Sequence, residues 1–298
     1  MNGKAAVTAP IPDCLPPLRP TRAPRWRPPP GAWDTHFHVL GPQSVFPYAA
    51  TRKYTPPDAS LDDCRRMHDT LGIERGFLVH ANTHGFDNSV DLDAVARSNE
   101  RYLAVVRTDA TVSPAKCEDW HARGVRGVRF AFNPQHGGEL DLAIFDKTLA
   151  CIEPLGWFVN LHFEGSAIPS LEQWLRSIRL KLVIDHIGRI DVEEGVDQAG
   201  FEILCDLARQ PNVWIKLSGV DRLSRRGPPY DDVAPFVRRL CELAPRSLLW
   251  GSDWPHTGVF DSARMPDDTD LLDAFCGFVP DEALRRRILV ENPLELLQ

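Results

Sequence analysis

The chain has 298 residues, 43% hydrophobic and 25% charged, which is typical of a globular protein and enough for one large barrel. Lys and Arg number 34 against 41 Asp and Glu, so the charge of −7 gives no sign of a nucleic-acid or membrane partner, and no apolar run could span a bilayer. The seven cysteines are scattered without a C-x-x-C pair, which predicts reduced, mostly buried thiols.

The beginning of the chain is rich in proline and includes the run Pro28-Pro29-Pro30. Because proline fixes φ and removes an N–H donor, residues 1–31 are predicted to be an extended, irregular extension. Such a segment could wrap around the domain, pack on a second subunit or stay mobile. Residues 32–298 are predicted to form a single domain.

From residue 32 onward, short β-branched or aromatic runs alternate with longer helical patterns. The predicted strands cover residues 32–38, 76–81, 102–108, 125–132, 157–163, 181–187, 212–218 and 247–253. Strands that alternate with helices in this way are typical of α/β folds with a parallel sheet. We therefore predict a (β/α)₈ barrel, of the TIM-barrel class, rather than an open sheet.

The helices between these strands have recognisable start and stop signals. Ser60 with Asp63 three residues later forms a capping box, and Gly72 ends that helix. Ser113-Pro114 begins a helix that ends at Gly124. Two further helical patterns cover residues 141–155 and 197–210.

The first predicted strand ends in Asp34-Thr35-His36-Phe37-His38. Because side chains alternate along a strand, His36 and His38 point to the same side and can bind one metal ion together. Three later runs also end in residues that bind metals: Asn160-Leu161-His162, Ile184-Asp185-His186 and Gly251-Ser252-Asp253.

In a parallel barrel, the carboxyl ends of the strands converge on one face, where the functional residues lie. We therefore predict one divalent ion, with Zn²⁺ expected, bound by His36, His38, His162 and Asp253. A metal lowers the pKa of bound water toward 7, so hydroxide could attack a substrate while Asp253 shuttles the proton. His186 is the candidate for polarising the carbonyl or stabilising the oxyanion. A metal-free barrel that uses these histidines directly is the alternative.

Three more histidines lie near strand ends or in the loops that follow, namely His80, His84 and His256. A single histidine in such a position is often a satisfied hydrogen-bonding residue. For these three, pocket lining and a structural role remain equally open.

Several longer motifs extend these single residues. They are Val45-Phe46-Pro47-Tyr48, Arg52-Lys53-Tyr54-Thr55-Pro56, Gly124-Val125-Arg126-Gly127-Val128-Arg129-Phe130, Asp185-His186-Ile187-Gly188-Arg189, Leu249-Trp250-Gly251-Ser252-Asp253-Trp254-Pro255-His256 and Glu291-Asn292-Pro293. With Asp34 to His38, they resemble the amidohydrolase superfamily, in its branch of 2-pyrone-4,6-dicarboxylate lactonase-like hydrolases. The resemblance runs from about residue 33 to the end of the chain. It implies the distorted barrel of that superfamily.

The resemblance also implies roles for individual residues. Asp253 corresponds to the aspartate that activates water, and His186 to the histidine that assists at the carbonyl. Tyr54 matches a tyrosine that contacts substrate. Arg129, Arg189 and Arg222 match arginines that bind carboxylates, for which the guanidinium fork is well suited. Arg52 and Arg126 fit a structural salt bridge between strands or in a loop better.

Two positions depart from the lactonase that defines this branch. That enzyme has a tyrosine at the end of its fifth strand and works without a metal, whereas this chain has His162. It also has a second basic residue shortly after its fourth strand, where this chain reads Phe132-Asn133-Pro134-Gln135-His136. These changes predict a metal-dependent enzyme in which one carboxylate-binding residue is missing or displaced.

The predicted function is therefore a cytoplasmic lactonase that opens a small anionic lactone from aromatic catabolism. A muconolactone-type ring, with or without a sulfonate, or a pyrone dicarboxylate, fits two or three arginines. One alternative is a metal-dependent decarboxylase of the same superfamily acting on an aromatic or enoic acid. A second is a non-catalytic binding barrel. No nucleic-acid or membrane partner is expected, and a homo-oligomer is compatible with the sequence.

Overall fold

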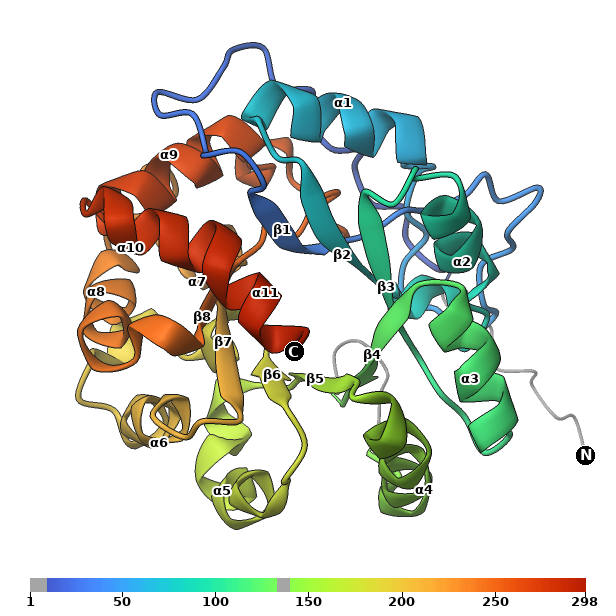
Figure 1. The fold of residues 1–298 in the computed structure, drawn as a ribbon. Coiled ribbons are helices and arrows are strands. Elements are labelled where there is room, and N and C mark those ends of the chain that lie inside the picture. Colours follow the sequence, from blue (N-terminus) through green and yellow to red (C-terminus); the bar gives the residue numbers. More distant parts are fainter. Residues whose placement is uncertain (1–9, 133–139) are drawn as a thin grey trace, which may run out of the picture.

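The computed structural model describes residues 10–132 and 140–298 and has eight parallel strands in sequence order around a barrel (Figure 1). The strands are β1 (Trp33–Phe37), β2 (Arg75–Val79), β3 (Tyr102–Val106), β4 (Val125–Ala131), β5 (Phe158–His162), β6 (Leu182–Ile184), β7 (Val213–Leu217) and β8 (Leu248–Trp250). This arrangement confirms the predicted (β/α)₈ barrel.

Helices surround the strands on the outside of the ring (Figure 1). They are α1 (Leu61–Leu71), α2 (Ser89–Ala96), α3 (Pro114–Ala122), α4 (Leu142–Ile152), α5 (Ile168–Ser177), α6 (Ala199–Ala208), α7 (Val220–Leu223), α8 (Ala234–Leu243), α9 (Asp268–Phe278), α10 (Glu282–Arg286) and α11 (Asn292–Leu296). The predicted capping box is present at α1, where the Ser60 hydroxyl accepts from the Asp63 N–H, and Gly72 ends the helix with a φ of 81°.

The interior of the barrel has an apolar lower layer and a polar upper layer. Strand side chains that are two residues apart share a face, so Trp214 in the apolar layer is followed by Lys216, and Phe158 by Asn160 and then His162. The lower layer also includes Leu296 of α11, whose helix lies over the middle of the ring in Figure 1. The alternation thus places the polar groups of these two strands above the apolar layer, toward the carboxyl ends of the strands.

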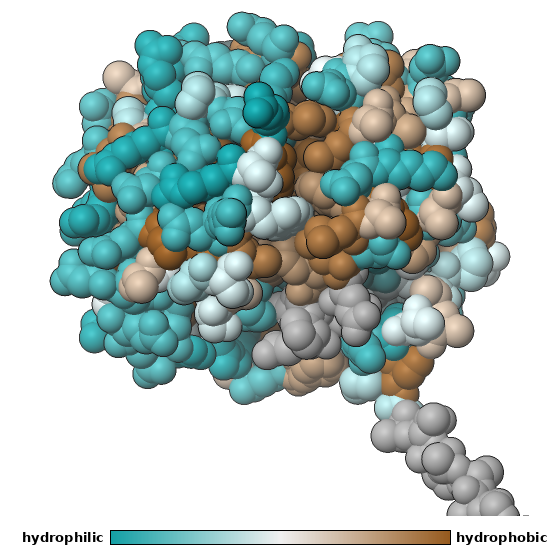
Figure 2. Space-filling view, turned by 90° about the horizontal axis from the view of Figure 1, so that it is seen from below, coloured by the Kyte–Doolittle hydropathy of each residue, from teal (hydrophilic) through white to brown (hydrophobic). Residues whose placement is uncertain are grey.

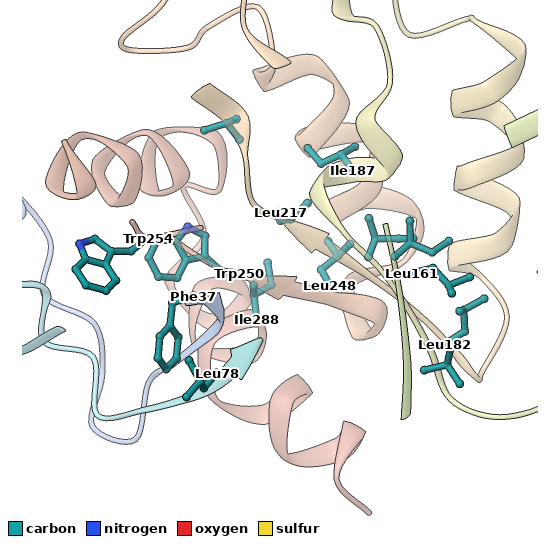
Figure 3. Packing of buried hydrophobic residues seen from close by; sticks show 14 of the residues in the cluster. Phe37, Leu78, Leu161, Leu182, Ile187, Leu217, Leu248, Trp250, Trp254 and Ile288 are labelled. Atoms are coloured by element: carbon teal, nitrogen blue, oxygen red, sulfur yellow. The ribbon is translucent and has the colours of Figure 1, made fainter. Parts of the chain in front are cut away.

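A second apolar layer packs between the strands and the surrounding helices. Figure 3 shows part of it, with Leu217, Leu248 and Trp250 from the last two strands close to Ile288. All four side chains are almost completely buried. Helices α4 and α5 lie on the side viewed in Figure 2, where hydrophilic residues surround a central group of hydrophobic ones.

The barrel closes between β8 and β1 at a seam formed by backbone and side-chain hydrogen bonds. The N–H of Asp253 donates to the His36 carbonyl, and the N–H of His38 donates to the Trp254 carbonyl, each at 2.8 Å. Buried Asp34 accepts from the backbone N–H groups of His36 at 2.9 Å and Ser252 at 3.1 Å. The seam therefore runs between the two strands that contribute His36 and Asp253.

The buried Asp34 carboxylate also connects the seam to α1 and β3. Its Oδ2 accepts from the Ser252 hydroxyl and lies 3.1 Å from His68 Nε2. The other His68 nitrogen is 2.8 Å from the Tyr102 hydroxyl. This network links β1, β8, α1 and β3 below the pocket.

The described part of the N-terminal segment is mainly irregular and contacts the barrel. Arg22 pairs with Asp270 and Asp273 of α9, and the N–H of Leu15 donates to the Val259 carbonyl at 2.8 Å. Residues 1–9 lie outside the described part. The domain boundary at residue 31 stays a prediction.

All eight strands are shorter than predicted, and β6 and β8 differ most. Strand β6 ends at Ile184 and β8 at Trp250, whereas the predicted strands ran to residues 187 and 253. His186 and Asp253 have φ values of 52° and 64°, in the left-handed region that a strand cannot contain. Both residues therefore lie just beyond a strand rather than at its end.

Two smaller predictions concern the cysteines and the membrane. All seven cysteines are free, and five of them are buried, as predicted. Within residues 10–132 and 140–298, no helix is long and apolar enough to cross a membrane.

Candidate active site

A pocket of about 430 Å³ opens at the carboxyl ends of the strands. Eight of the nine predicted site residues line it: His38, Tyr54, Arg129, His162, His186, Arg189, Arg222 and Asp253. The ninth, His36, is fully buried at the end of β1 beneath this pocket. The barrel therefore brings together side chains from six separate strand ends and the loops that follow them.

Three of these residues converge closely enough to hold a metal ion. Ligand atoms of His36, His38 and Asp253 all lie within 4.8 Å of one another. Asp253 Oδ1 is 3.5 Å from His36 Nε2 and 3.6 Å from His38 Nε2. Among the residues that the structure describes, His36 Nε2 has no hydrogen-bond partner although it is buried. A buried nitrogen without a hydrogen-bond partner destabilises the fold unless it binds another group, and binding of a divalent ion by these three residues would satisfy it.

His162 lies in the same pocket but outside that close group. Its ring centroid is 5.3 Å from that of His186, and the side chain is buried. A second close group consists of His36, Asp185 and His186. In that group, however, the Asp185 carboxylate is already occupied by neighbouring cations.

Burial keeps three of the histidines neutral, namely His36, His162 and His186. It lowers the pKa of His36 and of His162 well below the ordinary value, and it lowers the pKa of His186 to about 4. For His162, the charge of Arg129 acts in the same direction. Neutral imidazoles have the free lone pair that a metal ion requires.

Asp253 remains ionised in spite of its burial. Burial acts to raise its pKa, but Arg222, His186 and His38 outweigh that effect and hold the pKa well below its usual range. The Arg222 Nε donates to Asp253 Oδ2 at 2.6 Å, while the Arg222 Nη1 donates to the Thr257 carbonyl at 3.1 Å. The other carboxylate oxygen of Asp253 faces the histidines.

His186 is fixed by the loop after β7. Its Nδ1 is 2.9 Å from the Ser218 hydroxyl, and its Nε2 is 3.9 Å from Asp253 Oδ1. A Cβ at Gly219 would lie 2.9 Å from His186 Nδ1, and the φ of Gly219 is +63°, so only glycine fits there. The ring therefore has one nitrogen toward the protein and one toward the pocket.

Left-handed backbone recurs at the residues that carry the chemistry. Asp253, His186 and Arg189 have φ values between 51° and 64°. Such values cost energy for residues other than glycine, and they concentrate at functional sites where the surroundings enforce them. The strained conformation turns these side chains toward the pocket.

Beneath the histidines lies a buried charge cluster. Asp185 Oδ1 is 3.0 Å from His36 Nδ1 and 3.2 Å from Lys216 Nζ, and Asp185 Oδ2 is 3.5 Å from Arg129 Nη2. Lys216 also donates to Asn160 Oδ1 at 2.5 Å. The carboxylate orients the His36 ring so that Nε2 faces Asp253.

The roles of Asp185 and Lys216 were not predicted from the sequence. Asp185 is part of a quoted motif, but nothing local shows that it contacts His36. Lys216 had a visible signal, because a lysine in the middle of the apolar run of β7 must have a buried partner. That signal does not say which carboxylate the lysine meets.

Each of the three predicted substrate arginines also has an acidic partner. Arg129 pairs with Asp185, Arg222 pairs with Asp253, and Arg189 Nε donates to Glu164 Oε1 at 3.1 Å. The Tyr54 hydroxyl donates to Thr257 Oγ1 at 2.7 Å on the same wall. The positive charge of these arginines is therefore partly neutralised before any substrate enters.

The histidines that were left open have structural partners. His80 lies 2.6 Å from Asp91 and 3.0 Å from the Gly85 carbonyl, and His256 lies 3.1 Å from Asp268. His84 packs against Tyr48. None of the three lines the pocket as the described residues form it.

Arg52 and Arg126 have structural contacts, but these are hydrogen bonds rather than the predicted salt bridges. Arg52 donates to Thr55 Oγ1 and to the Ala49 carbonyl, and Arg126 donates to the carbonyls of His121 and Val125. The predicted loss of a basic residue around Gln135 lies outside the described residues.

Comparison with known proteins gives a consistent result. A model of the family described as amidohydrolase matches residues 33–298. The chain is 50% identical over 292 residues to 4-sulfomuconolactone hydrolase of Rhizobium radiobacter, covering 98% of each chain. It is 38% identical over 285 residues to 2-pyrone-4,6-dicarboxylate hydrolase of Comamonas testosteroni, covering 92% of each. A solved apo structure from Agrobacterium tumefaciens, 34% identical, superposes with a TM-score of 0.84 and covers 94% of this chain and 98% of its own.

Proposed function

This chain belongs to the amidohydrolase family, and we propose that it hydrolyses a small lactone with two acidic groups, with 4-sulfomuconolactone as the first candidate substrate. The observation that carries the proposal is the 50% identity to a 4-sulfomuconolactone hydrolase across nearly the whole of both chains. The arginines around the pocket support an anionic substrate, because guanidinium groups bind carboxylate and sulfonate oxygens through paired hydrogen bonds.

We further propose that one divalent ion, with Zn²⁺ expected, binds to His36, His38, His162 and Asp253. The support is the buried, unbonded His36 Nε2 and the closeness of His38 and Asp253 to it. His162, which lines the same pocket, is the proposed fourth ligand. When bound, such an ion polarises the lactone carbonyl and makes hydroxide available near neutral pH.

Asp253 is proposed to move the proton in the reaction. Its Oδ2 is held by Arg222, while Oδ1 faces the pocket and can accept a proton from the attacking water. Because its pKa lies well below the usual range, Asp253 is a weak base that releases the proton readily. It can therefore transfer the proton to the ring oxygen as the ester bond breaks.

His186 is proposed to stabilise charge on the carbonyl oxygen. In the tautomer in which the Ser218 hydroxyl donates to Nδ1, the ring proton is on Nε2 and points into the pocket. With a pKa of about 4, the ring keeps this neutral form at working pH. A neutral N–H can donate to the developing oxyanion without competing with Asp253 for the proton.

A test of the reaction class is product analysis on purified protein. Incubation with 4-sulfomuconolactone or 2-pyrone-4,6-dicarboxylate should give a ring-opened acid with no loss of carbon. Release of CO₂ from an aromatic or enoic acid, without lactone turnover, would instead indicate the decarboxylase alternative. Binding of the lactones without any product would point to a non-catalytic barrel.

We expect about one equivalent of divalent metal per chain after purification without chelators, because neutral histidines and a carboxylate form a complete donor set. Elemental analysis measures the content, and dialysis against a chelator should remove both metal and activity. Less than about a tenth of an equivalent, together with chelator-resistant turnover, would contradict the metal-dependent mode and favour the metal-free one.

Replacing Arg189 with Met should raise KM about 10- to 100-fold with a smaller change in kcat, which is the size of one lost charge-assisted hydrogen bond. Arg189 suits this test because its partner, Glu164, is only partly buried, so the loss leaves no fully buried charge unpaired. Steady-state kinetics on the anionic lactone measure the effect. Arg176→Met on the surface of α5 is the matched control. An unchanged KM would assign Arg189 a structural role.

A further inference from the structure

A second pocket of about 380 Å³ lies beside the first, at the carboxyl ends of β3 and β4. Arg129 lines both pockets, so this residue lies between them. The second pocket is also lined by Phe86, Arg107, Phe130 and Ile144. Nothing in the reaction described above uses this space.

Arg107 follows β3 and is held in place without a carboxylate. Its backbone N–H donates to Asn88 Oδ1 at 2.8 Å, and its carbonyl accepts from Asn88 Nδ2 at 2.9 Å. The Arg107 Nη1 donates to the Gly85 carbonyl at 3.1 Å, and the guanidinium carbon lies 4.5 Å from the centre of the Phe86 ring. The side chain is therefore fixed and remains fully charged.

Within the described part of the chain, Arg107 differs from the other arginines near the site because it has no acidic partner. Arg129, Arg189 and Arg222 each pair with a carboxylate, whereas no carboxylate among the described residues lies within ion-pair distance of Arg107. Asp141 also lines the second pocket, but its Oδ1 accepts from the N–H groups of Ala143 and Ile144 at the start of α4. The Asp141 carboxylate therefore caps the N-terminus of α4.

The two arginines of this pocket repel each other. Burial, together with the charge of Arg129, lowers the pKa of Arg107 to about 10, so it stays protonated at neutral pH. In addition, Arg129 Nε is buried and has no hydrogen-bond partner in the described parts of the chain. Of these two neighbouring cations, only Arg129 pairs with a carboxylate of the described residues, and this leaves a positive charge that an anion would neutralise.

We propose that Arg107, together with Arg129, forms a subsite for the sulfonate group of the substrate, next to the pocket that holds the lactone ring. This inference rests on the proposed function and adds the position of the second acidic group. A sulfonate has three oxygens around a tetrahedral centre, so it can accept from two guanidinium groups that approach from different sides. Arg107 thus supplies a cation from the loop after β3, whereas the second basic residue of the related lactonase follows its fourth strand.

The test compares the native enzyme with Arg107→Met on two lactones, 4-sulfomuconolactone and muconolactone, which lacks the sulfonate. The substitution should lower kcat/KM for the sulfonated lactone about 10- to 100-fold, mainly through KM, and leave muconolactone nearly unaffected. Arg107→Lys keeps the charge but loses the fork, so it should give an intermediate loss. Arg97→Met, at an exposed position just after α2, is the matched control.

A binding measurement separates this subsite from the proposed reaction. Isothermal titration calorimetry with 4-sulfobenzoate and benzoate, which do not react, should give tighter binding of the sulfonate by the native protein and similar binding of both by Arg107→Met. If neither lactone is hydrolysed but this difference holds, the proposed function is wrong and the subsite stands. Arg107→Gln keeps a donor for the Gly85 carbonyl and replaces Arg107→Met if that variant does not fold.

Two outcomes would overturn the subsite. One is an equal loss of kcat/KM on both lactones, which would mean that Arg107 acts on a shared group or only on the fold. The other is an unchanged preference for 4-sulfobenzoate over benzoate in Arg107→Met.

Discussion

Replacing Asp253 with Asn should reduce kcat about 10²- to 10⁴-fold, the usual contribution of a general acid–base group. The amide keeps the size of the side chain and can still accept from Arg222, but it cannot take a proton from water. Because Asp253 also lies 3.5 Å from His36 Nε2, metal content must be measured with the rate. Stopped-flow or steady-state hydrolysis of 4-sulfomuconolactone gives the change.

The matched control for this variant is Asp206→Asn, an exposed aspartate on α6 that should leave kcat unchanged. A loss of rate that metal addition restores would assign Asp253 to metal binding alone. Near-native turnover with full metal content would show that the proton is moved by another group.

The second large effect is expected on stability, at Asp34. Asp34→Ala should lower the free energy of unfolding by about 3–5 kcal/mol, because it leaves several buried donors without an acceptor. Those donors are the N–H groups of His36 and Ser252, the Ser252 hydroxyl and the ring of His68. Urea unfolding followed by circular dichroism measures the loss.

Asp62→Ala, on the exposed side of α1, is the control for the Asp34 variant. It should change the unfolding free energy by less than about 0.5 kcal/mol, as is usual for surface positions. A loss below about 1 kcal/mol for Asp34→Ala would mean that water or a local shift satisfies these donors. The seam would then depend mainly on the two backbone hydrogen bonds.

The order of the elements could be predicted because it depends on local signals. Alternating apolar runs, the capping box at Ser60 and the glycines after helices all act within a few residues. The exact strand ends could not be predicted in the same way. His186 and Asp253 leave the strand through left-handed backbone, which their surroundings enforce and which residue type alone does not indicate.

Much of the candidate site could be located from the sequence because a parallel barrel brings its strand ends to one face. What the sequence could not provide was the pairing of charges. That Asp185 lies between His36, Lys216 and Arg129 depends on three strands meeting in space. For the same reason, the sequence could not show that Arg107, unlike the other arginines of the site, pairs with no carboxylate of the described residues.

The seam between β1 and β8 has a consequence for synthesis of the protein. Its hydrogen bonds join residues that are 215 and 218 positions apart, so β1 cannot form them until β8 and the residues after it have been synthesised. During translation, β1 with His36 therefore emerges long before Asp253. Until then the nascent chain keeps an unpaired strand edge that can pair with other chains. The enzyme therefore gains its active site in one late step, and chaperone demand should be greatest just before β8 appears.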